Sequence, residues 1–361
     1  MKVLFVTRKW PPAVGGMETY SVELCKQLEN HVDLTIRKLP GKEDGSPPSP
    51  IAILVFFISS LFFLVFNAKR YDVVHIGDFV LAPLGWISKI LAPKTKTVIM
   101  IHGLDILYGN RRGLLPAIYR VYQHTMQKLY CADYFIANSE NTGRLCISAG
   151  FSPVEIIPLG VNTHLPPLTS SDHDSSILFL GRLVVRKGAL WFAKNVLPGL
   201  PEHITMKVVG KTWDQSEEGG LLNCHRVEMM GYVSEQSLNI LKQQCMLAVM
   251  PNQPSENATD VEGFGLVAAE LSMQGIPLLA SNIDGITCAV LDGKTGFLVE
   301  HDNVQQWQTK VLEIEKWTAQ QRQDFSRRCI AETESYFSWQ RVAQDTLTLY
   351  KKLMSKGKSP L

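Results

Sequence analysis

Two basic side chains follow a short apolar run in the second half of the sequence. The run is Ile177–Leu180, and Gly181, Arg182, Lys187 and Gly188 come after it. The guanidinium of Arg182 is a planar fork of donors that suits phosphate oxygens, and the ammonium of Lys187 is a compact point charge. If the run is a strand, both cations lie at its carboxyl end and could bind a diphosphate. Taken alone, a solvated basic loop explains the segment at least as well.

Two carboxylates, Glu262 and Glu270, form a second element with glycines between them. The spacing places Glu262 on a loop and Glu270 about one and a half turns into a helix that begins near Gly265. Carboxylates accept hydrogen bonds from the paired hydroxyls of sugars and ribose, and amides at a helix start can donate to phosphate oxygens. For a bare pair, ordinary surface glutamates are the default explanation.

The first half of the sequence holds two further elements. Gly15 and Gly16 precede a helical stretch, and two glycines there let backbone amides approach an anion, although a tight turn is the simpler reading. His102 follows the apolar run Thr97–Ile101 and precedes Gly103. It is placed to face a ligand, but a capping or core histidine is equally consistent.

Short apolar runs that alternate with helical stretches must position these side chains. Six candidate strands precede a linker and six follow it: Lys2–Thr7, Val32–Arg37, Asp72–Ile76, Thr97–Ile101, Tyr134–Ala137, Glu155–Pro158, Ile177–Leu180, Thr205–Val209, Arg226–Met229, Leu247–Met250, Pro277–Ala280 and Gly296–Val299. Runs rich in Val, Ile and Leu between helices predict parallel sheets covered on both faces. Two such series predict an α/β protein of two doubly wound Rossmann-like domains, and ligands of such folds bind at the carboxyl ends of the strands.

The predicted linker, residues 159–176, contains two prolines and a Ser/Asp/His cluster, a composition typical of a hinge. We therefore expect an N-terminal domain of residues 1–165 and a C-terminal domain of residues 166–337. Asp172-His173-Asp174 in this linker has the spacing of a metal-binding D-x-D motif, but it precedes a strand instead of following one, so we expect no metal role for it.

Composition limits the class of protein. The chain has 361 residues, 45% of them hydrophobic and 19% charged, which is typical of a globular protein with two cores. A net charge of +2 gives no reason to expect nucleic acid, although residues 1–165 carry +5 and the remainder −3, which weakly favours an anionic surface or ligand for the first half. The seven scattered cysteines lack a C-x-x-C pair, which argues against zinc and a disulfide framework and fits a reducing compartment. Lys2–Thr7 reads as a strand, so we expect no signal peptide.

Residues 51–66 form an unbroken apolar run after a proline-rich stretch and before Lys69 and Arg70. The run is shorter than the roughly 20 residues of a membrane span. A helix in the bilayer interface is the leading interpretation, a helix buried by protein the second, and a span the third. In the first case, we expect polar substitution of Phe56, Phe57, Phe62 and Phe63 to release the protein from vesicles.

The four elements occur in order, each at the end of a predicted strand, and together they resemble the retaining GT-B glycosyltransferases of family four, which include bacterial phosphatidylinositol mannosyltransferases. The resemblance covers essentially the whole chain. Its motifs are Pro-Pro-x-x-Gly-Gly at 11–16, His-Gly-x-Asp at 102–105, Ile-Pro-Leu-Gly-Val-Asn at 157–162, Gly-Arg-Leu-x-x-x-Lys-Gly at 181–188, Gly-Tyr-Val at 231–233, and Glu262 to Glu270 followed by Gly-x-Pro at 275–277. The segment Asp284 to Cys288 departs from the family pattern and puts the donor contacts of that loop in doubt.

The resemblance implies catalytic roles for four side chains. Arg182 and Lys187 would hold the donor diphosphate, Glu262 would contact donor sugar hydroxyls, and His102 would hydrogen-bond the transferred sugar. Glu270 would bind the ribose. Further donor contacts are implied at Gly15, Gly16, Gly181, Gly231, Tyr232, Val233, Gly263, Phe264, Gly265, Leu266 and Val267, with acceptor-side candidates at Asp105 and Glu18.

As a reaction, the resemblance implies transfer of a hexose, with retention, from a nucleotide-diphosphate sugar to a lipid-linked or saccharide acceptor of the cell envelope. No cofactor and no metal would be needed. We expect a cytoplasmic protein in peripheral contact with the inner face of the plasma membrane, with the last helix, about residues 339–354, packed back on the first domain. The alternatives are a sugar-nucleotide 2-epimerase of the same architecture and a non-catalytic carbohydrate-binding homologue.

Overall fold

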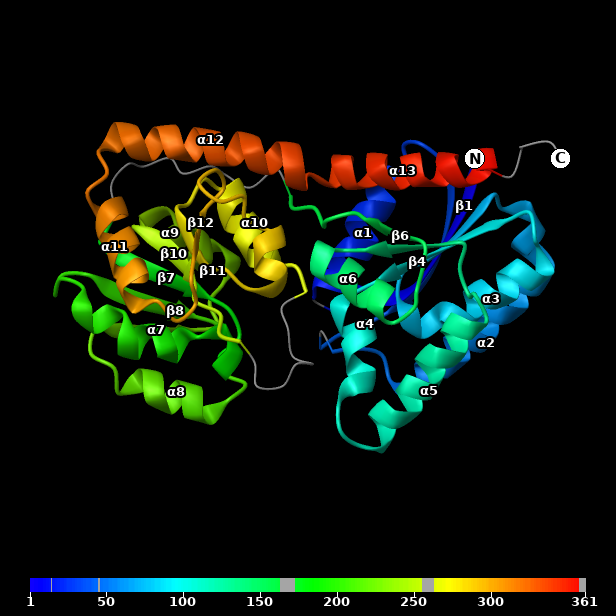
Figure 1. The fold of residues 1–361 in the computed structure, drawn as a ribbon, viewed down its shortest axis with the longest axis horizontal. Coiled ribbons are helices and arrows are strands. Elements are labelled where there is room, and N and C mark those ends of the chain that lie inside the picture. Colours follow the sequence, from blue (N-terminus) through cyan, green and yellow to red (C-terminus); the bar gives the residue numbers. More distant parts are fainter. Residues whose placement is uncertain (14, 45, 163–172, 255–262, 357–361) are drawn as a thin grey trace. The chain divides into compact units, whose positions relative to one another are not determined.

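The computed structural model describes residues 1–356 except 14, 45, 163–172 and 255–262. These residues divide into two compact units (Figure 1). Unit 1 holds residues 1–160, Gly263 and 339–356, and unit 2 holds 161–254 and 264–338. The chain thus passes from unit 1 to unit 2 within the predicted linker.

Unit 1 is built on a six-stranded parallel sheet in the order β2-β1-β3-β4-β5-β6. The strands are β1 Lys2–Trp10, β2 Asp33–Pro40, β3 Val73–Ile76, β4 Lys96–Ile101, β5 Tyr134–Ala137 and β6 Val154–Ile156. Strand β1 pairs with both β2 and β3, so the chain changes direction across the sheet at β1. The carboxyl ends of β1 and β3 therefore mark the topological switch point, where doubly wound folds bind ligands.

Helices cover both faces of this sheet. They are α1 Gly16–Leu28, α2 Pro50–Asn67, α3 Ala82–Leu91, α4 Gly103–Leu107, α5 Leu114–Lys128, α6 Glu140–Ser148 and α13 Trp339–Lys356. Alternate residues of a strand point to opposite faces. Leu4 of β1 packs with Leu64 of α2, whereas His75 of β3 contacts Tyr20 of α1 and Tyr350 of α13. The last helix thus completes the second face of the first sheet.

Helix α2 contains the long apolar run. Its first turn is capped by Ser49, whose hydroxyl accepts from Ala52 N, and proline occupies the first helical position. Only a narrow stripe, Phe56, Ser60 and Leu64, is buried. Residues 50–70 are long and apolar enough to cross a membrane by length and composition, and 22% of the most apolar window is buried. Because β1 pairs with the strands on both sides of α2, a span through the bilayer is incompatible with this sheet.

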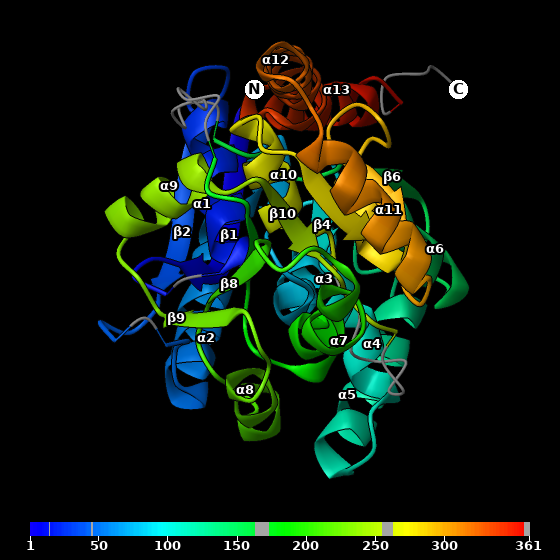
Figure 2. The same cartoon turned by 90° about the vertical axis from the view of Figure 1, so that its left-hand side faces the viewer.

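Unit 2 repeats the architecture with the strand order β12-β11-β10-β7-β8-β9, again all parallel. The strands are β7 Ser176–Leu180, β8 Thr205–Val209, β9 Val227–Gly231, β10 Leu247–Met250, β11 Leu278–Ser281 and β12 Phe297–Val299. The helices are α7 Ala189–Asn195, α8 Gln215–Leu222, α9 Glu235–Gln244, α10 Leu266–Met273, α11 Val304–Glu315 and α12 Ala319–Phe337. Phe192 of α7 and Trp307 of α11 belong to the core on one face of the sheet (Figure 2). The switch point lies between β7 and β10.

The predicted fold class of two doubly wound parallel α/β domains is confirmed. Each of the twelve predicted strands overlaps a strand of the described structure. The largest difference is in the first pair, where β1 continues to Trp10 and pairs there with Pro40 across an irregularity in the register. This extension was missed because Arg8 and Lys9 do not read as buried strand residues, although the backbone still pairs.

Gly188 and Gly293 offer a matched test of packing in unit 2. Both have left-handed backbones, with φ of 71° and 70°, so alanine strains both equally. A Cβ on Gly188 would overlap the carbonyl oxygen of Pro251, whereas a Cβ on Gly293 meets nothing within 4 Å. We expect Gly188→Ala to cost about 1–3 kcal/mol more than Gly293→Ala in urea unfolding followed by tryptophan fluorescence. Equal losses in the two variants would contradict the close approach.

Candidate active site

Glycines bring three strand ends of unit 2 into close backbone contact. Gly181 follows β7 and Gly210 follows β8, and a Cβ on Gly210 would overlap the carbonyl oxygen of Gly181. Gly210 N also donates to Gly231 O, at the end of β9, over 2.9 Å. Together with the contact of Gly188 on Pro251 after β10, these approaches fix the loops at the carboxyl edge of the sheet.

The two predicted phosphate-binding cations lie at this edge in different environments. Lys187 belongs to a 3-10 turn, Val185–Lys187, and is buried, with its Cδ 4.0 Å from where Gly181 would carry a Cβ. Arg182 is exposed, with its guanidinium carbon 4.7 Å from the ring centroid of Trp213. Stacking on a ring uses the face of a guanidinium and leaves its N–H edges to bind an anion. Trp213 was not predicted, because nothing in its spacing indicates the contact.

Glu270 lies on α10 and is half-buried. Burial raises the pKa of its carboxyl, and the ammonium of Lys242 on α9 acts in the opposite direction. Burial likewise lowers the pKa of Lys242, which Glu270 partly offsets. The buried ammonium-bearing side chain of Lys242 and the half-buried Glu270 therefore influence each other's charge, next to the helix start that was predicted to bind the donor. Lys242 was missed by the sequence analysis, since it lies on another helix.

Helix α10 begins where the sequence predicts. Gly265 is its N-cap residue with φ of 83°, and Leu266 is the first helical residue. The turn Asp284–Cys288 packs close to Gly265 through Ile286. Phe264 is buried and packs on Phe337, 5.7 Å between ring centroids. The remaining predicted donor residues of unit 2 include Tyr232, which is 88% exposed. Glu262 lies outside the described residues.

In unit 1, the glycines at the start of α1 lie beside an ion pair. The carboxylate of Glu18 is 3.2 Å from Lys9 Nζ, and its Oε2 lies 2.7 Å from where Gly15 would carry a Cβ. Gly16 is the first residue of α1, and Glu18 is buried in its first turn. Glu18, an acceptor-side candidate, thus sits over the helix start with its charge paired to Lys9.

His102 is buried at the end of β4 and is the N-cap residue of α4. Its Nε2 lies 3.3 Å from Gly77 O, and because a carbonyl only accepts, Nε2 carries the proton and Nδ1 is the unprotonated nitrogen. Burial lowers the pKa of the ring to about 4. The cations of Lys9 and Arg8 also lower this pKa, and Glu18 raises it. His102 is therefore neutral near pH 7, next to a cluster of charges.

Arg8, Asp78 and Asp105 form a buried charge cluster at the switch point of unit 1. Arg8 Nε donates to Asp78 Oδ1 over 2.8 Å, and His102 N donates to Asp105 Oδ2 over 2.9 Å. Burial, and next the charge of Asp78, raise the pKa of Asp105 to about 7. Burial lowers the pKa of Arg8, but Asp78 and Asp105 together raise it by more. Arg8 and Asp78 were missed, although both stand at the ends of predicted strands that a switch point brings together.

We expect Asp105→Asn to change the pH dependence of stability. The folded protein holds a proton on Asp105 up to about pH 7, whereas the unfolded chain releases it near pH 4, so this group makes the native state less stable as pH rises between these values. The free energy of unfolding of Asp105→Asn relative to the parent should therefore increase from pH 4 to 7, by at least about 1 kcal/mol, and then level off. Urea unfolding at each pH measures it, and a constant difference would show that Asp105 titrates normally.

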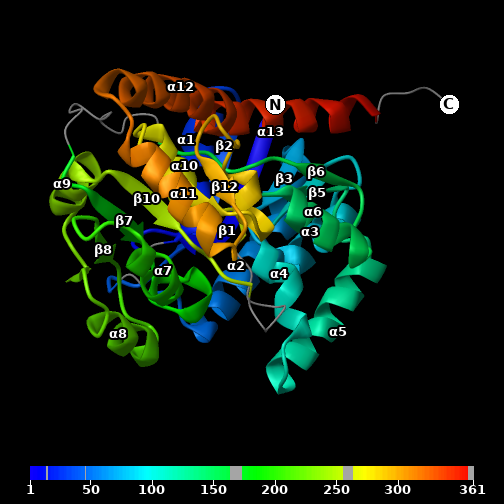
Figure 3. The same cartoon turned by 60° about the vertical axis from the view of Figure 1, so that its left-hand side comes forward.

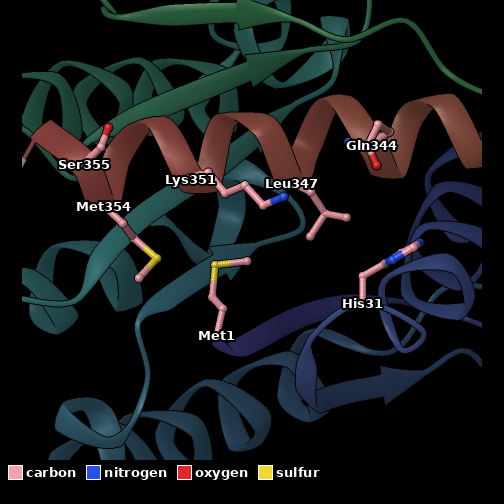
Figure 4. A pocket seen from close by; sticks show the side chains of 7 residues that line it. All are labelled: Met1, His31, Gln344, Leu347, Lys351, Met354 and Ser355. Atoms are coloured by element: carbon pink, nitrogen blue, oxygen red, sulfur yellow. The ribbon is translucent and has the colours of Figure 1, made fainter.

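A groove of about 510 Å³ in unit 1 does not belong to this site. It is lined by Met1, His31, Gln344, Leu347, Lys351, Met354 and Ser355 (Figure 4). Met1 precedes β1, so the groove opens at the amino end of the sheet, opposite the edge that carries His102 and Arg8.

The described residues offer no group of three or more His, Cys, Asp or Glu side chains arranged to hold a metal. Of the D-x-D motif, Asp174 accepts from Ser176 N over 3.0 Å and pairs with Lys207. Asp172 lies outside the described part of the chain. Asp174, the described residue of this pair of aspartates, therefore stabilises the start of β7.

Two family models match the chain in succession. Residues 14–165 match the model described as Glycosyltransferase Family 4, and residues 174–316 match Glycosyl transferases group 1. These ranges correspond to most of unit 1 and most of unit 2.

Several curated proteins are similar to this chain. An uncharacterised glycosyltransferase of Methanocaldococcus jannaschii is 22% identical over 98% of this chain and 99% of its own. D-inositol 3-phosphate glycosyltransferase of Mycolicibacterium smegmatis is 26% identical over 79% of this chain and 68% of its own. The enzyme of that name from Paenarthrobacter aurescens is 39% identical, but over only 26% of this chain and 22% of its own length.

Solved structures share the fold over the whole chain. HepE of Anabaena, solved in complex with UDP-glucose, has a TM-score of 0.69 at 19% identity and covers 99% of this chain and 100% of its own. The lipopolysaccharide outer core galactosyltransferase WaaB in its apo form has a TM-score of 0.68 at 15% identity, with 98% and 100% covered. At identities this low, the similarity shows that the chain shares the two-domain fold of these two structures.

Proposed function

The chain belongs to the group 1 glycosyltransferases of family 4 and has their GT-B fold, and from this premise we propose that it moves a hexose from a nucleotide-diphosphate sugar to a lipid-linked or saccharide acceptor. The observation that carries the proposal is the buried side chain of Lys187 and the guanidinium of Arg182 over the Trp213 ring, both at the switch point of unit 2. Cations fixed at that edge suit the diphosphate of a donor.

The comparisons support a nucleotide-sugar donor, because HepE was solved with UDP and with UDP-glucose. We propose that the ribose binds Glu270, whose charge is balanced by Lys242. A uridine diphosphate sugar is the first donor to test, and thermal shift against a set of nucleotide sugars would identify the donor, since a ligand that binds only the native state raises its melting temperature.

Charge explains the proposed mechanism. The bond from the sugar to the diphosphate breaks, and negative charge grows on the leaving phosphate oxygens. The cation of a largely buried side chain such as Lys187 is screened by water less than a surface cation is, and we propose that it stabilises that charge without a metal. We propose that the acceptor hydroxyl attacks on the face that the diphosphate leaves, with retention, and that a leaving oxygen takes its proton. His102, neutral near pH 7, contributes a hydrogen bond and no charge.

We expect Lys187→Ala to lower kcat by about 100-fold or more while nucleotide diphosphate binding weakens about tenfold or less, because the leaving charge is greatest in the transition state. Steady-state kinetics and calorimetric titration of the nucleotide measure the two effects. Lys194→Ala is the control, since Lys194 is exposed on α7. Equal losses in turnover and binding would contradict a transition-state role for Lys187.

The two alternatives can be tested with the same enzyme. An epimerase would convert the donor sugar without an acceptor, so incubation with donor alone, followed by analysis of the sugar, distinguishes it from a transferase. A non-catalytic homologue would bind sugars but neither transfer nor hydrolyse any donor.

We also propose peripheral contact of unit 1 with an anionic membrane on the cytoplasmic side. Helices α2 and α5 both pack against α3 (Figures 1 and 3) and carry the largest groups of exposed apolar side chains among the described residues. On α2 these are Ile51, Leu54, Val55, Ile58, Phe62, Val65 and Phe66, and on α5 they are Leu114, Leu115, Ile118 and Val121. Residues 45–71 and 106–132 contain basic but no acidic residues. Exposed apolar side chains with nearby cations are typical of helices that lie in an anionic bilayer interface.

The structure corrects the residues expected to make this contact. Phe56 is buried in the core of unit 1, and Phe57 and Phe63 pack against that core. Of the four phenylalanines chosen from the sequence, Phe62 is exposed. Residues 51–66 have apolar side chains on every side of the helix, so the sequence did not show which side would be buried.

A triple variant of Val55, Phe62 and Phe66 to serine should bind vesicles that contain anionic phospholipid at least about tenfold more weakly than the parent, since each side chain contributes about 1.5–3 kcal/mol when it leaves water. Vesicle flotation measures binding, and donor-dependent thermal shift confirms that unit 2 is intact. Ile240→Ser is the control, because Ile240 is exposed on α9 of unit 2. Unchanged flotation of the triple variant would refute membrane contact through α2.

A further inference from the structure

A chain of buried aromatic side chains in unit 1 connects the C-terminal helix to His102. Tyr350 on α13 and Tyr20 on α1 lie on opposite sides of the His75 ring, with Tyr350 Oη 2.5 Å from Nδ1 and Tyr20 Oη 3.2 Å from Nε2. The ring of Tyr20 then meets the ring of His102 edge-on, 5.5 Å between centroids at 81°. All four residues are buried, and Tyr350 is fully so.

The hydrogen bonds of His75 are matched to a neutral ring. Burial lowers the pKa of His75 to about 3, so the ring has one N–H donor and one acceptor nitrogen near pH 7. One tyrosine hydroxyl must therefore donate and the other must accept. The ring of Phe5 lies 4.9 Å from that of His75, and the His75 side chain is fully buried. Loss of either hydroxyl leaves a buried nitrogen unsatisfied, and the ring is then free to turn.

Helix α13 reaches Tyr20 at a second point. The ring of Trp339, at the start of α13, lies 6.4 Å from the ring of Tyr20. Trp339 itself is fixed against Gly160, where a Cβ would lie 2.6 Å from its ring. Tyr20 therefore meets α13 at two points, Trp339 directly and Tyr350 through His75, and its ring also meets the ring of His102.

We infer that Tyr350 is a positioning residue for sugar transfer: through His75 and Tyr20, helix α13 holds the ring of His102 in its reactive orientation. The inference rests on the proposed function, in which His102 hydrogen-bonds the transferred sugar. It adds three buried residues, Tyr20, His75 and Tyr350, and Tyr350 lies more than two hundred residues from His102 in the sequence. A turned His102 ring would misdirect its hydrogen bond, which affects turnover more than donor binding.

A double-mutant cycle tests whether Tyr350 acts through His102. Tyr350→Phe keeps the ring and removes the hydroxyl, and we expect kcat to fall about tenfold with the donor KM changed less than about twofold. In the His102→Ala background, Tyr350→Phe should lower kcat less than about twofold further, since the group it positions is absent. Thr346→Val is the control, because the Thr346 hydroxyl is buried on the same helix but donates only to Val342 O. Independent, multiplicative losses would overturn the inference.

A spectroscopic readout keeps the inference testable if the proposed function fails. With histidine labelled by ¹⁵N and ¹³C in the full chain, Tyr350→Phe should shift the ring resonances of both His75 and His102, whereas Thr346→Val should shift neither. A shift at His75 without one at His102 would show that the contact ends at His75 and overturn the inference. If no nucleotide sugar supports transfer, the proposed function is wrong, and the two ring shifts alone decide whether α13 positions His102.

Discussion

The approach of backbone to backbone at the carboxyl edge of the second sheet is the constraint on which the positions of Arg182 and Lys187 depend. Parallel strands end at one edge, and the loops after β7, β8 and β10 can meet there only where no side chain intervenes. Gly188 and Gly210 have no Cβ, so the backbones can meet at these two positions. Once the loops are in contact, the turn between them must bury Lys187 and leave Arg182 outside on Trp213. The chemistry of the two cations thus follows from where glycine is required.

The first sheet has buried charged groups at its carboxyl edge. At its switch point the buried carboxyl groups of Asp78 and Asp105 lie near Arg8, whose side chain is 14% exposed, and unpaired charge is costly where water is largely excluded. Arg8 pairs with the carboxylate of Asp78. Asp105 keeps its proton up to about neutral pH, so it adds no second buried negative charge below that pH. His102, beside them, sheds its proton for the same reason. The carboxyl edge of the second sheet therefore carries two cations, whereas the carboxyl edge of the first sheet carries hydrogen-bonding groups whose charges nearly cancel.

Much of this fold could be predicted because buried parallel strands have a clear signature. Runs of Val, Ile and Leu between helices located every strand, and His102 and Lys187 lie after strand ends as predicted, with Gly265 at the start of a helix. The interactions that the sequence analysis missed join residues that are far apart in the sequence, so no local pattern indicated them. Lys242 influences the charge of Glu270 from another helix, and Trp213 lies under the guanidinium of Arg182 from another loop. The apolar helix α2 misled in a further way: with no polar face, its sequence could not show that Phe56 turns inward.

The position of α13 bears on how the chain acquires its structure during synthesis. Unit 1 is discontinuous in sequence, since its first 160 residues leave the ribosome long before residues 339–356. In that interval the face of the sheet that carries Phe5 and His75 lacks its second covering helix. Unit 2 is complete once Ser338 has emerged, whereas the first domain to be translated is the last to be finished. An early stop codon before Trp339 would therefore leave an exposed apolar face on the N-terminal domain and a complete C-terminal one.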